Sequence, residues 1–265
     1  MTRLLSALAL LVVIGGAAWL APPEGLVAMA VAIAGLAFVE LARLGAALGA
    51  RVPRVAGLVL TALVCASMAW PGVSLVPAVV ALLVVAAVVA VTAGTPDRAG
   101  TAGLAVTVAG PLYVGLPLGA LVGIGLEYGR EAAFLVVLTV VASDSAQYYA
   151  GRLFGRTPLA PAISPKKTVE GAIGGYLGGA AAMAWLGGLW LPSIPVGMRL
   201  ALAVVLVTLG IVGDLLESVI KRAAQVKDSA DLIPGHGGVL DRIDALLLVV
   251  PVYYVALRAM SKGVL

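Results

Sequence analysis

Long apolar runs separated by short polar connections make up most of the chain. These runs predict nine membrane spans, at about residues 4–20, 25–42, 55–70, 73–93, 101–126, 131–150, 169–191, 199–221 and 243–260. A helix is the usual form of such a span, because it satisfies its own backbone hydrogen bonds inside lipid. The strict alternation of polar and apolar residues that marks barrel strands is absent. The pattern therefore predicts an all-α, polytopic integral membrane protein with about nine transmembrane helices.

Two of the predicted spans have unusual features. Pro111 and Pro117 lie inside the fifth span, and we expect them to kink or break its helix. The first span ends at 16-GAAWLA-21, whose small residues are also found where signal peptides are cleaved. We expect this segment to be a span, because no soluble segment follows it for export.

Composition and charge support a membrane location and suggest an orientation. The chain is 62% hydrophobic and only 11% charged, with a mean hydropathy of +1.12. Lys and Arg gather in alternate connections: Arg43, Arg51 and Arg54; Arg98; Arg152, Arg156, Lys166 and Lys167; and Lys221, Arg222 and Lys227. The positive-inside rule places these connections in the cytoplasm, at the inner (cell) membrane. The net charge of +4 needs only anionic lipid as a partner, so we expect no nucleic acid.

The acidic residues divide the chain into two parts. Residues 1–140 contain five of them, all near the predicted ends of spans, and residues 141–265 contain the other eight, several within spans. We therefore expect residues 1–140 to be scaffold helices and residues 141–265 to be the catalytic part of one continuous membrane domain. Asp144 lies about two turns inside the sixth span, where a carboxylate needs a salt bridge, a metal ion or a substrate.

The segment 164-SPKKTVEGAIGG-175 predicts a helix start that carries two lysines. Ammonium groups at a helix N terminus favour an anion such as phosphate, although Lys166 and Lys167 could equally be membrane anchors. The glycines that follow recur at four-residue spacing, as Gly171, Gly175 and Gly179 and as Gly174 and Gly178. This spacing predicts close packing against another helix.

Two further polar segments follow. In 213-GDLLESVIKR-222, four polar residues share one helical face, which predicts either a site for ions or an internal ion pair: Asp214, Glu217, Ser218 and Lys221. In 234-PGHGGVLDRID-244, Gly and Pro surround His236, and Asp241 and Asp244 follow at the start of the ninth span. A helix-dipole effect would explain the two carboxylates, but it would not explain the glycines.

Four carboxylates from three spans are thus predicted near one membrane face: Asp144, Asp214, Asp241 and Asp244. The single His and the single Cys offer no spacing for zinc, whereas oxygen ligands suit Mg²⁺, which also binds phosphates. Metal ligands and phosphate-binding groups at a bilayer favour phosphoryl or nucleotidyl transfer to a lipid.

The segments Ser218-x-x-Lys221-Arg222, Lys227-Asp228 and 234-PGHGGVLDRID-244 resemble the signature of the phosphatidate cytidylyltransferase (CDP-diacylglycerol synthase) family. The resemblance covers about the last 120 residues and includes the SPKK segment and the Asp144 region. Ala230 stands where the family often has Gly. The resemblance implies transfer of a cytidylyl group from CTP to phosphatidate, with Mg²⁺ and in a homodimer. Two metal ions are expected, of which the second is either Mg²⁺ or a monovalent cation.

The resemblance also implies roles for individual residues. Asp214, Asp241 and Lys221 become the catalytic residues, and the metal ligands are Asp144, Asp214, Asp241 and Asp244. The implied substrate-binding residues are Ser164, Lys166, Lys167, Thr168, Glu170, Ser218, Arg222, Lys227, Asp228, His236, Gly237, Gly238 and Arg242. Two alternatives remain at this point: a CTP-dependent enzyme acting on another lipid, of the CDP-archaeol synthase or polyprenol kinase type, and an ion-coupled transporter.

Overall fold

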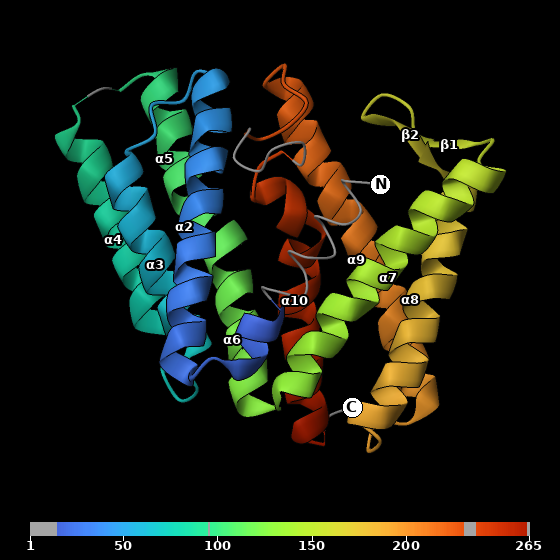
Figure 1. Cartoon of the computed structure of the whole chain (residues 1–265). Helices are drawn as coiled ribbons and strands as arrows, with labels where there is room; N and C mark the ends of the chain where they lie inside the picture. Colours follow the sequence, from blue (N-terminus) through green and yellow to red (C-terminus); the bar gives the residue numbers. More distant parts are fainter. Residues whose placement is uncertain (1–14, 95, 231–236, 264–265) are drawn as a thin grey trace. The chain divides into compact units, whose positions relative to one another are not determined.

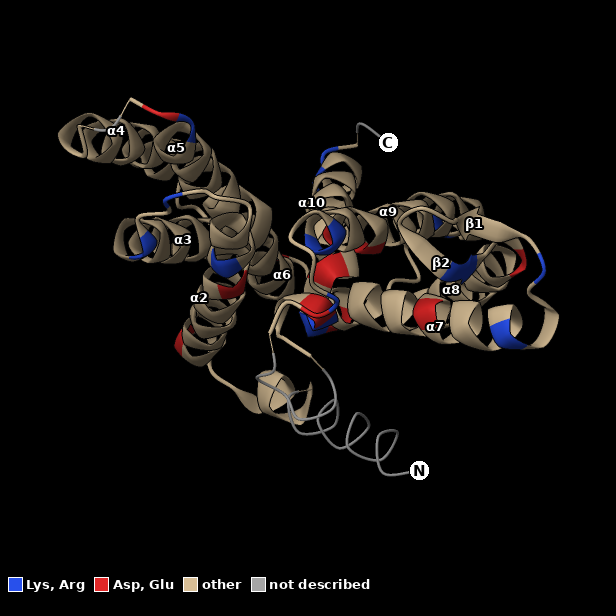
Figure 2. Ribbon diagram, turned by 90° about the horizontal axis from the view of Figure 1, so that it is seen from above, with Lys and Arg blue, Asp and Glu red and all other residues tan. Residues whose placement is uncertain are grey.

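A computed structural model of the protein describes residues 15–94, 96–230 and 237–263 (Figure 1). Within these ranges the chain is helical apart from one short hairpin, and six helices are long and apolar enough to cross a membrane. Two shorter apolar helices, α3 (Arg54–Ala69) and α4 (Val76–Thr92), correspond to the third and fourth predicted spans. The predicted count of nine is not confirmed, and most of the first predicted span lies outside the described residues. Figure 2 shows how few charged residues these helices carry.

The chain divides into two compact units, which are described separately. The first unit comprises residues 1–126 and 228–242, and the second comprises residues 127–227 and 243–265. The predicted boundary at residue 140 falls within helix α7 (Arg130–Phe154).

The first unit is a helical bundle of α2 (Pro23–Ala47), α3, α4, α5 (Arg98–Gly110), the π-helix η1 (Pro111–Gly115) and α6 (Leu116–Glu127). Helix α2 packs against α3, and α3 packs against α4. The fully buried ring of Phe38 on α2 fills the space left by Gly57 and Gly110, where an added Cβ atom would collide with it. Large and small residues are therefore matched across these helices, as in a well-packed interior.

Helix α5 begins and ends at residues that its sequence marks clearly. The Asp97 carboxylate accepts a hydrogen bond from the Gly100 N–H at 2.8 Å, and this bond together with Arg51 holds the pKa of Asp97 below its usual value. At the other end the α-helical pattern changes to a π-turn at Pro111, which has no N–H to donate. Pro117 lies in the first turn of α6. The helical path continues through both prolines over Arg98–Glu127, so the span is not broken and the local change is the π-turn at Pro111. The expected kink stays a prediction.

The second unit contains α7, the strands β1 (Pro158–Ala160) and β2 (Ser164–Thr168), α8 (Val169–Trp190), α9 (Val196–Ala223) and most of α10 (Leu240–Ser261). Helices α7 and α8 lie against each other, and α8 also contacts α9 (Figure 1). The two strands pair antiparallel, with Pro158 opposite Thr168. The hairpin departs from the predicted all-α fold, and it changes the setting of the two lysines, because residues 164–168 form a strand and not a helix start.

Glycines allow α8 to approach its neighbours closely. A Cβ atom at Gly178 would lie 2.6 Å from the Cβ of Ala146 on α7, and one at Gly174 would lie 3.0 Å from the Ala146 carbonyl oxygen. Gly179 faces Val207 of α9, with no room for a side chain. The predicted role of the repeated glycines in helix packing is therefore confirmed.

This packing predicts that Gly178→Leu destabilises the protein. The new side chain would force α8 away from α7, and overpacking of this kind costs about 1–3 kcal/mol of unfolding free energy. The matched control is Ala181→Leu, which adds the same side chain at an exposed position of the same helix. The measurement is the midpoint of thermal unfolding of each purified variant in detergent. Equal midpoints for the two variants would contradict the packing role of Gly178.

Candidate active site

The close approach of α9 to α10 brings two carboxylates of the second unit near each other. A Cβ atom at Gly213 on α9 would lie 2.7 Å from the carbonyl oxygen of Asp244 on α10, so only glycine fits there. Asp214 follows Gly213 directly, and its carboxylate interacts electrostatically with that of Asp244. Asp144 on α7 is exposed and interacts electrostatically with both of these carboxylates. Three helices thus contribute one acidic residue each to the same region.

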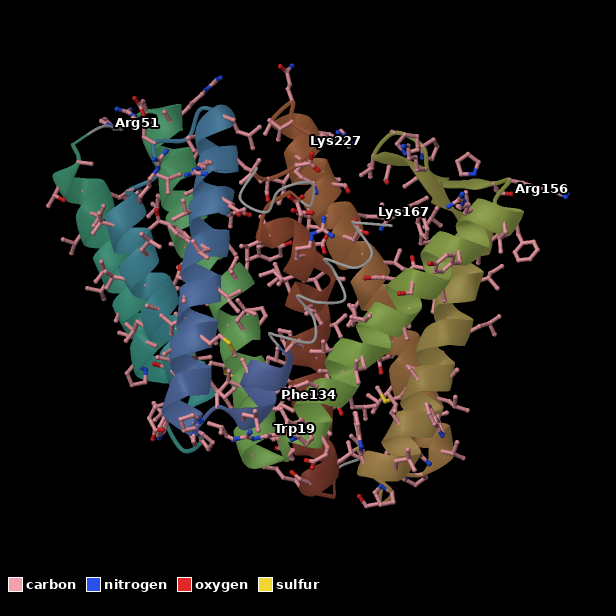
Figure 3. All side chains as sticks on the ribbon, in the orientation of Figure 1. Trp19, Arg51, Phe134, Arg156, Lys167 and Lys227 are labelled. Atoms are coloured by element: carbon pink, nitrogen blue, oxygen red, sulfur yellow. The ribbon has the colours of Figure 1, made fainter. Side chains whose placement is uncertain are left out.

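Lys167 is the cation nearest to this region. Its Nζ atom lies 2.5 Å from Oδ2 of Asp214, and its side chain on β2 is directed towards α9 (Figure 3). The side chain is mostly buried, with 20% of its surface exposed, whereas the preceding residue, Lys166, is exposed. The hairpin therefore brings one of the two predicted phosphate-binding lysines to the carboxylates.

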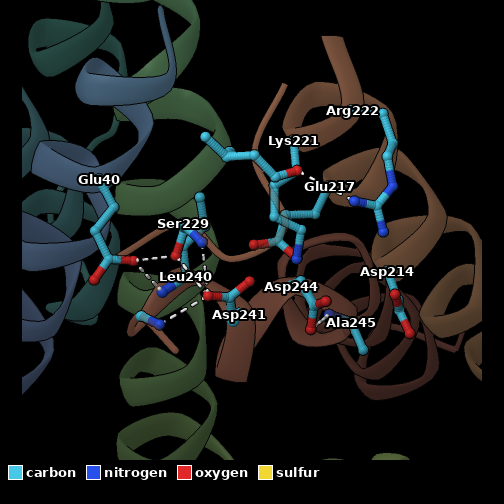
Figure 4. A network of polar contacts seen from close by, with 12 residues as sticks. Glu40, Asp214, Glu217, Lys221, Arg222, Ser229, Leu240, Asp241, Asp244 and Ala245 are labelled. Carbon is cyan, nitrogen blue, oxygen red and sulfur yellow. Dashed lines mark hydrogen bonds and ion pairs between the residues drawn. The ribbon is translucent and has the colours of Figure 1, made fainter. Parts of the chain in front are cut away.

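A second carboxylate–ammonium pair lies one turn along α9. The Glu217 side chain is fully buried, and its Oε2 atom lies 2.6 Å from Nζ of Lys221 (Figure 4). The Glu217 carboxyl is also within hydrogen-bonding reach of Asp244. The internal ion pair that the sequence allowed as an alternative is therefore present. We call the residues Asp144, Asp214, Glu217 and Asp244 the acidic cluster.

Two side chains at the start of α8 accept hydrogen bonds from backbone N–H groups. Oγ1 of Thr168 accepts a hydrogen bond from the Gly171 N–H at 3.1 Å, and this contact caps the helix. The Glu170 carboxylate accepts hydrogen bonds from the backbone N–H groups of Arg156 and Thr157, at 3.0 and 3.1 Å. Lys166 and Lys167 directly precede this cap, so they lie beside the N terminus of α8. The expected helix start at Ser164 is wrong, because residues 164–168 form strand β2.

The structure also describes most of the other predicted binding residues. Arg222 is exposed at the end of α9, where its Nη1 donates to the Val226 carbonyl at 3.2 Å and its Nε lies 3.5 Å from the Ile163 carbonyl. Ser164 and Ser218 are partly buried, and the exposed residues are Lys227, Asp228 and Arg242. His236 lies outside the described residues.

Asp241 has a different environment, within the first unit. Its Oδ2 atom accepts hydrogen bonds from the Gly238 N–H at 2.7 Å and from the Ser229 N–H at 2.9 Å. The same atom lies 2.8 Å from the Ser229 hydroxyl, whose single hydrogen is shared between Asp241 and Glu40. Gly237 adopts a positive φ of 78°, which favours glycine. Asp241 therefore stabilises the turn before α10. Its predicted pairing with Asp214 stays a prediction, because the two residues belong to different units.

Glu40 on α2 is a polar residue of this region that the sequence did not single out. It is fully buried and accepts hydrogen bonds from the Ser229 hydroxyl and from the backbone N–H groups of Val239 and Leu240 (Figure 4). Its only signal in the sequence was a carboxylate just inside the end of the predicted span at residues 25–42, which did not distinguish it from the other acidic residues near span ends. Its partners lie 189–200 positions further along the chain and have no local pattern that points to it.

The acidic cluster has the chemistry of a site for a hard cation. Four carboxyl groups face two ammonium groups among the described residues of the second unit, which leaves an excess of negative charge among apolar helices. Within the described ranges, no group of three or more His, Cys, Asp and Glu residues has an arrangement that could hold a metal ion. Mg²⁺ commonly uses one or two carboxylates and takes its other ligands from water and substrate phosphates. Asp214 and Asp244 fit that smaller set.

Comparison with known proteins identifies relatives of this chain. Residues 1–260 match the cytidylyltransferase family. A phosphatidate cytidylyltransferase of Haemophilus influenzae is 46% identical over 131 residues, which cover 48% of this chain and 45% of the relative. The enzyme of the same name from Thermotoga maritima is 37% identical over 156 residues (57% of each chain), and that from Bacillus subtilis is 41% identical over 137 residues (51% of this chain, 50% of the relative).

The chain spans about half the length of the curated relatives it matches. The family match, by contrast, extends from residue 1 to residue 260 and includes the helices that carry the acidic cluster. The chain therefore belongs to the cytidylyltransferase family.

Proposed function

We propose that this protein transfers the cytidylyl group of CTP to phosphatidate, producing CDP-diacylglycerol and pyrophosphate. The observation that carries the proposal is the acidic cluster with Lys167 and Lys221, set among apolar helices. Carboxylates and ammonium groups at membrane level suit a reaction between a phosphorylated nucleotide and a phosphorylated lipid. The relatives named phosphatidate cytidylyltransferase support this choice of substrates.

The reaction demands positioning and charge neutralisation more than acid–base chemistry. An anionic phosphate oxygen of phosphatidate forms a bond to the α-phosphorus of CTP, and the bond from that phosphorus to the bridging oxygen of pyrophosphate breaks. The attacking oxygen already carries a negative charge, so neither a Ser or Cys nucleophile nor a strong general base is needed. The protein must instead hold two anions together in line, and preorganised charges perform this task well.

The cluster residues have separate tasks in this scheme. Asp214 and Asp244, with Asp144 beside them, would hold Mg²⁺, and we propose a second metal ion or a monovalent cation alongside it. Bound Mg²⁺ would neutralise phosphate charge that builds up during transfer. Lys167, Lys221 and Arg222 would bind phosphate oxygens directly. Glu217 keeps Lys221 in place through their ion pair.

We further propose that the protein works as a homodimer in the inner membrane, with its active site at the cytoplasmic face. The basic residues between α7 and α8 and after α9 support this orientation by the positive-inside rule. CTP is a cytoplasmic nucleotide, so the same orientation would give the site access to its soluble substrate.

The direct test of the proposed function is an assay of the purified protein in detergent. With labelled CTP, Mg²⁺ and phosphatidate, we expect labelled CDP-diacylglycerol and an equal amount of pyrophosphate. Diacylglycerol, which lacks the attacking phosphate, is the matched acceptor and should yield no product. Transfer of the γ-phosphate of CTP to a polyprenol, with release of CDP, would assign the protein to a different reaction.

Asp214→Asn and Asp244→Asn test the proposed metal ligands. Each variant keeps the side-chain size and removes the charge, and we expect each to lower kcat by ~10²-fold or more. The double variant should lose much less than the product of the two effects, because ligands of one site act as a unit. Asp241→Asn belongs in the same series: if Asp241 is a further ligand, its loss should raise the Mg²⁺ concentration needed for half-maximal rate.

The control for this series is Glu24→Gln, which removes a charge at an exposed position of α2 and should leave the rate unchanged. Steady-state rates measured over a range of Mg²⁺ concentrations give the result. If both single variants have the same turnover and the same Mg²⁺ requirement as the unsubstituted protein, Asp214 and Asp244 are not metal ligands.

The two adjacent lysines of β2 provide a matched pair of variants. Lys167→Ala removes the ammonium group beside Asp214, and we expect kcat/KM to fall by an amount equivalent to roughly 1–3 kcal/mol, the scale of a charge-assisted hydrogen bond. Lys166→Ala removes the same charge from the exposed face of the strand and should have a small effect. Equal losses in both variants would indicate a general effect of charge at the membrane surface.

A further inference from the structure

Glu40 makes an unusual set of contacts for a residue of an apolar helix. Val239 donates its N–H to Oε1 at 2.8 Å, and Leu240 donates its N–H to Oε2 at 2.8 Å. The Ser229 hydroxyl lies 2.7 Å from Oε2. Glu40 is fully buried, and all three partners belong to the segment that leads into α10. The carboxylate therefore holds this segment against α2 within the first unit.

The contacts suit a carboxylate and no other side chain of the same size. Both oxygens accept a backbone N–H, so a glutamine at position 40 would turn its NH₂ group towards one of these donors. The donors also lie at the start of α10, where the free N–H groups and the helix dipole favour a negative charge. A buried donor left without an acceptor costs about 1–3 kcal/mol. The charge on Glu40 thus matters to the position of the helix start.

Ser229 connects Glu40 to Asp241. Its Oγ atom lies 2.7 Å from Oε2 of Glu40 and 2.8 Å from Oδ2 of Asp241. The same Oδ2 atom accepts the N–H groups of Gly238 and Ser229. Gly238 is packed so closely against Glu40 and Ser229 that an added Cβ would collide with both. A displacement of Glu40 must therefore displace Ser229, Gly238 and Asp241.

We propose that Glu40 is a positioning residue for the cytidylyl transfer. It contacts no substrate in this role. It fixes Ser229 and the first residues of α10, and these contacts set the position of Asp241 and of the Gly237–Gly238 turn. This inference rests on the proposed function, because the turn belongs to the segment that resembles the cytidylyltransferase signature.

The test compares Glu40→Gln with Glu24→Gln, the same substitution at an exposed position of the same helix. The first measurement is hydrogen–deuterium exchange of the purified full-length protein in detergent. Glu40→Gln should speed exchange in peptides covering residues 228–242 and leave exchange in α7 and α8 unchanged. Glu24→Gln should change neither. If hydrogen–deuterium exchange of residues 228–242 is the same in Glu40→Gln as in the unsubstituted protein, the proposed contact is overturned, whatever the activity of the variant.

The second measurement is steady-state turnover with CTP and phosphatidate. Glu40→Gln should lower kcat by ~10²-fold, the scale expected when reacting groups shift by about 1 Å. A faster exchange of residues 228–242 with unchanged kinetics overturns the positioning role. Failure of the unsubstituted protein to use CTP and phosphatidate counts against the proposed function instead, and the exchange measurement remains a test of the contact alone.

Ser229→Ala provides a second variant in case Glu40→Gln does not fold. It removes one of the three contacts and leaves the two backbone hydrogen bonds to Glu40 in place. We expect faster local exchange and a smaller loss of kcat than in Glu40→Gln. Because both residues act through one contact, the double variant should lose less than the product of the single losses. Independent, multiplicative losses overturn the link through Ser229.

Discussion

Placing carboxylates among apolar helices is the constraint on which the rest of this structure depends. An ionised carboxyl group at membrane level is costly unless a cation, an ion pair or hydrogen-bond donors compensate for it. The acidic cluster of the second unit meets this demand partly through Lys167 and Lys221, and Glu40 meets it in the first unit through three hydrogen-bond donors. The two solutions differ in kind: Glu40 is paired with neutral donors, whereas the cluster retains more carboxyl than ammonium groups.

Small residues make these arrangements possible. Helices in lipid gain little from the hydrophobic effect between them, so close backbone contact and van der Waals packing hold them together. Gly213 lets α9 approach the α10 backbone beside Asp244, and Gly178 lets α8 approach α7 beside Ala146. Close packing thus serves the chemistry as well as the fold, because it brings carboxylates on separate helices within electrostatic range.

The turn before α10 shows how a few side chains can fix the start of a helix. Asp241 stabilises the turn by accepting hydrogen bonds from the N–H groups of Gly238 and Ser229. Glu40 on α2 stabilises it by accepting a hydrogen bond from the Ser229 hydroxyl. The N–H groups of Gly238, Val239 and Leu240 all have carboxylate acceptors, so the helix start is occupied by the protein's own charges. Under the proposed function, phosphate binding would therefore depend on Lys167, Lys221 and Arg222 more than on the α10 N terminus.

The sequence by itself determined the features that depend on neighbours along the chain. Apolar runs predicted the six helices that are long and apolar enough to cross a membrane, because hydropathy is a local property. The glycine spacing predicted the packing face of α8, and Pro111 marked the place where the α-helical pattern changes to a π-turn, because proline lacks an N–H. The 164–168 strand was missed because Ser-Pro followed by lysines also resembles a helix start. Only the tertiary structure decided that Lys167 and not Lys166 meets Asp214, and that Glu40 holds a segment 189–200 residues away. Such pairings depend on how helices pack in three dimensions, and local sequence patterns do not specify the partner of a buried charge.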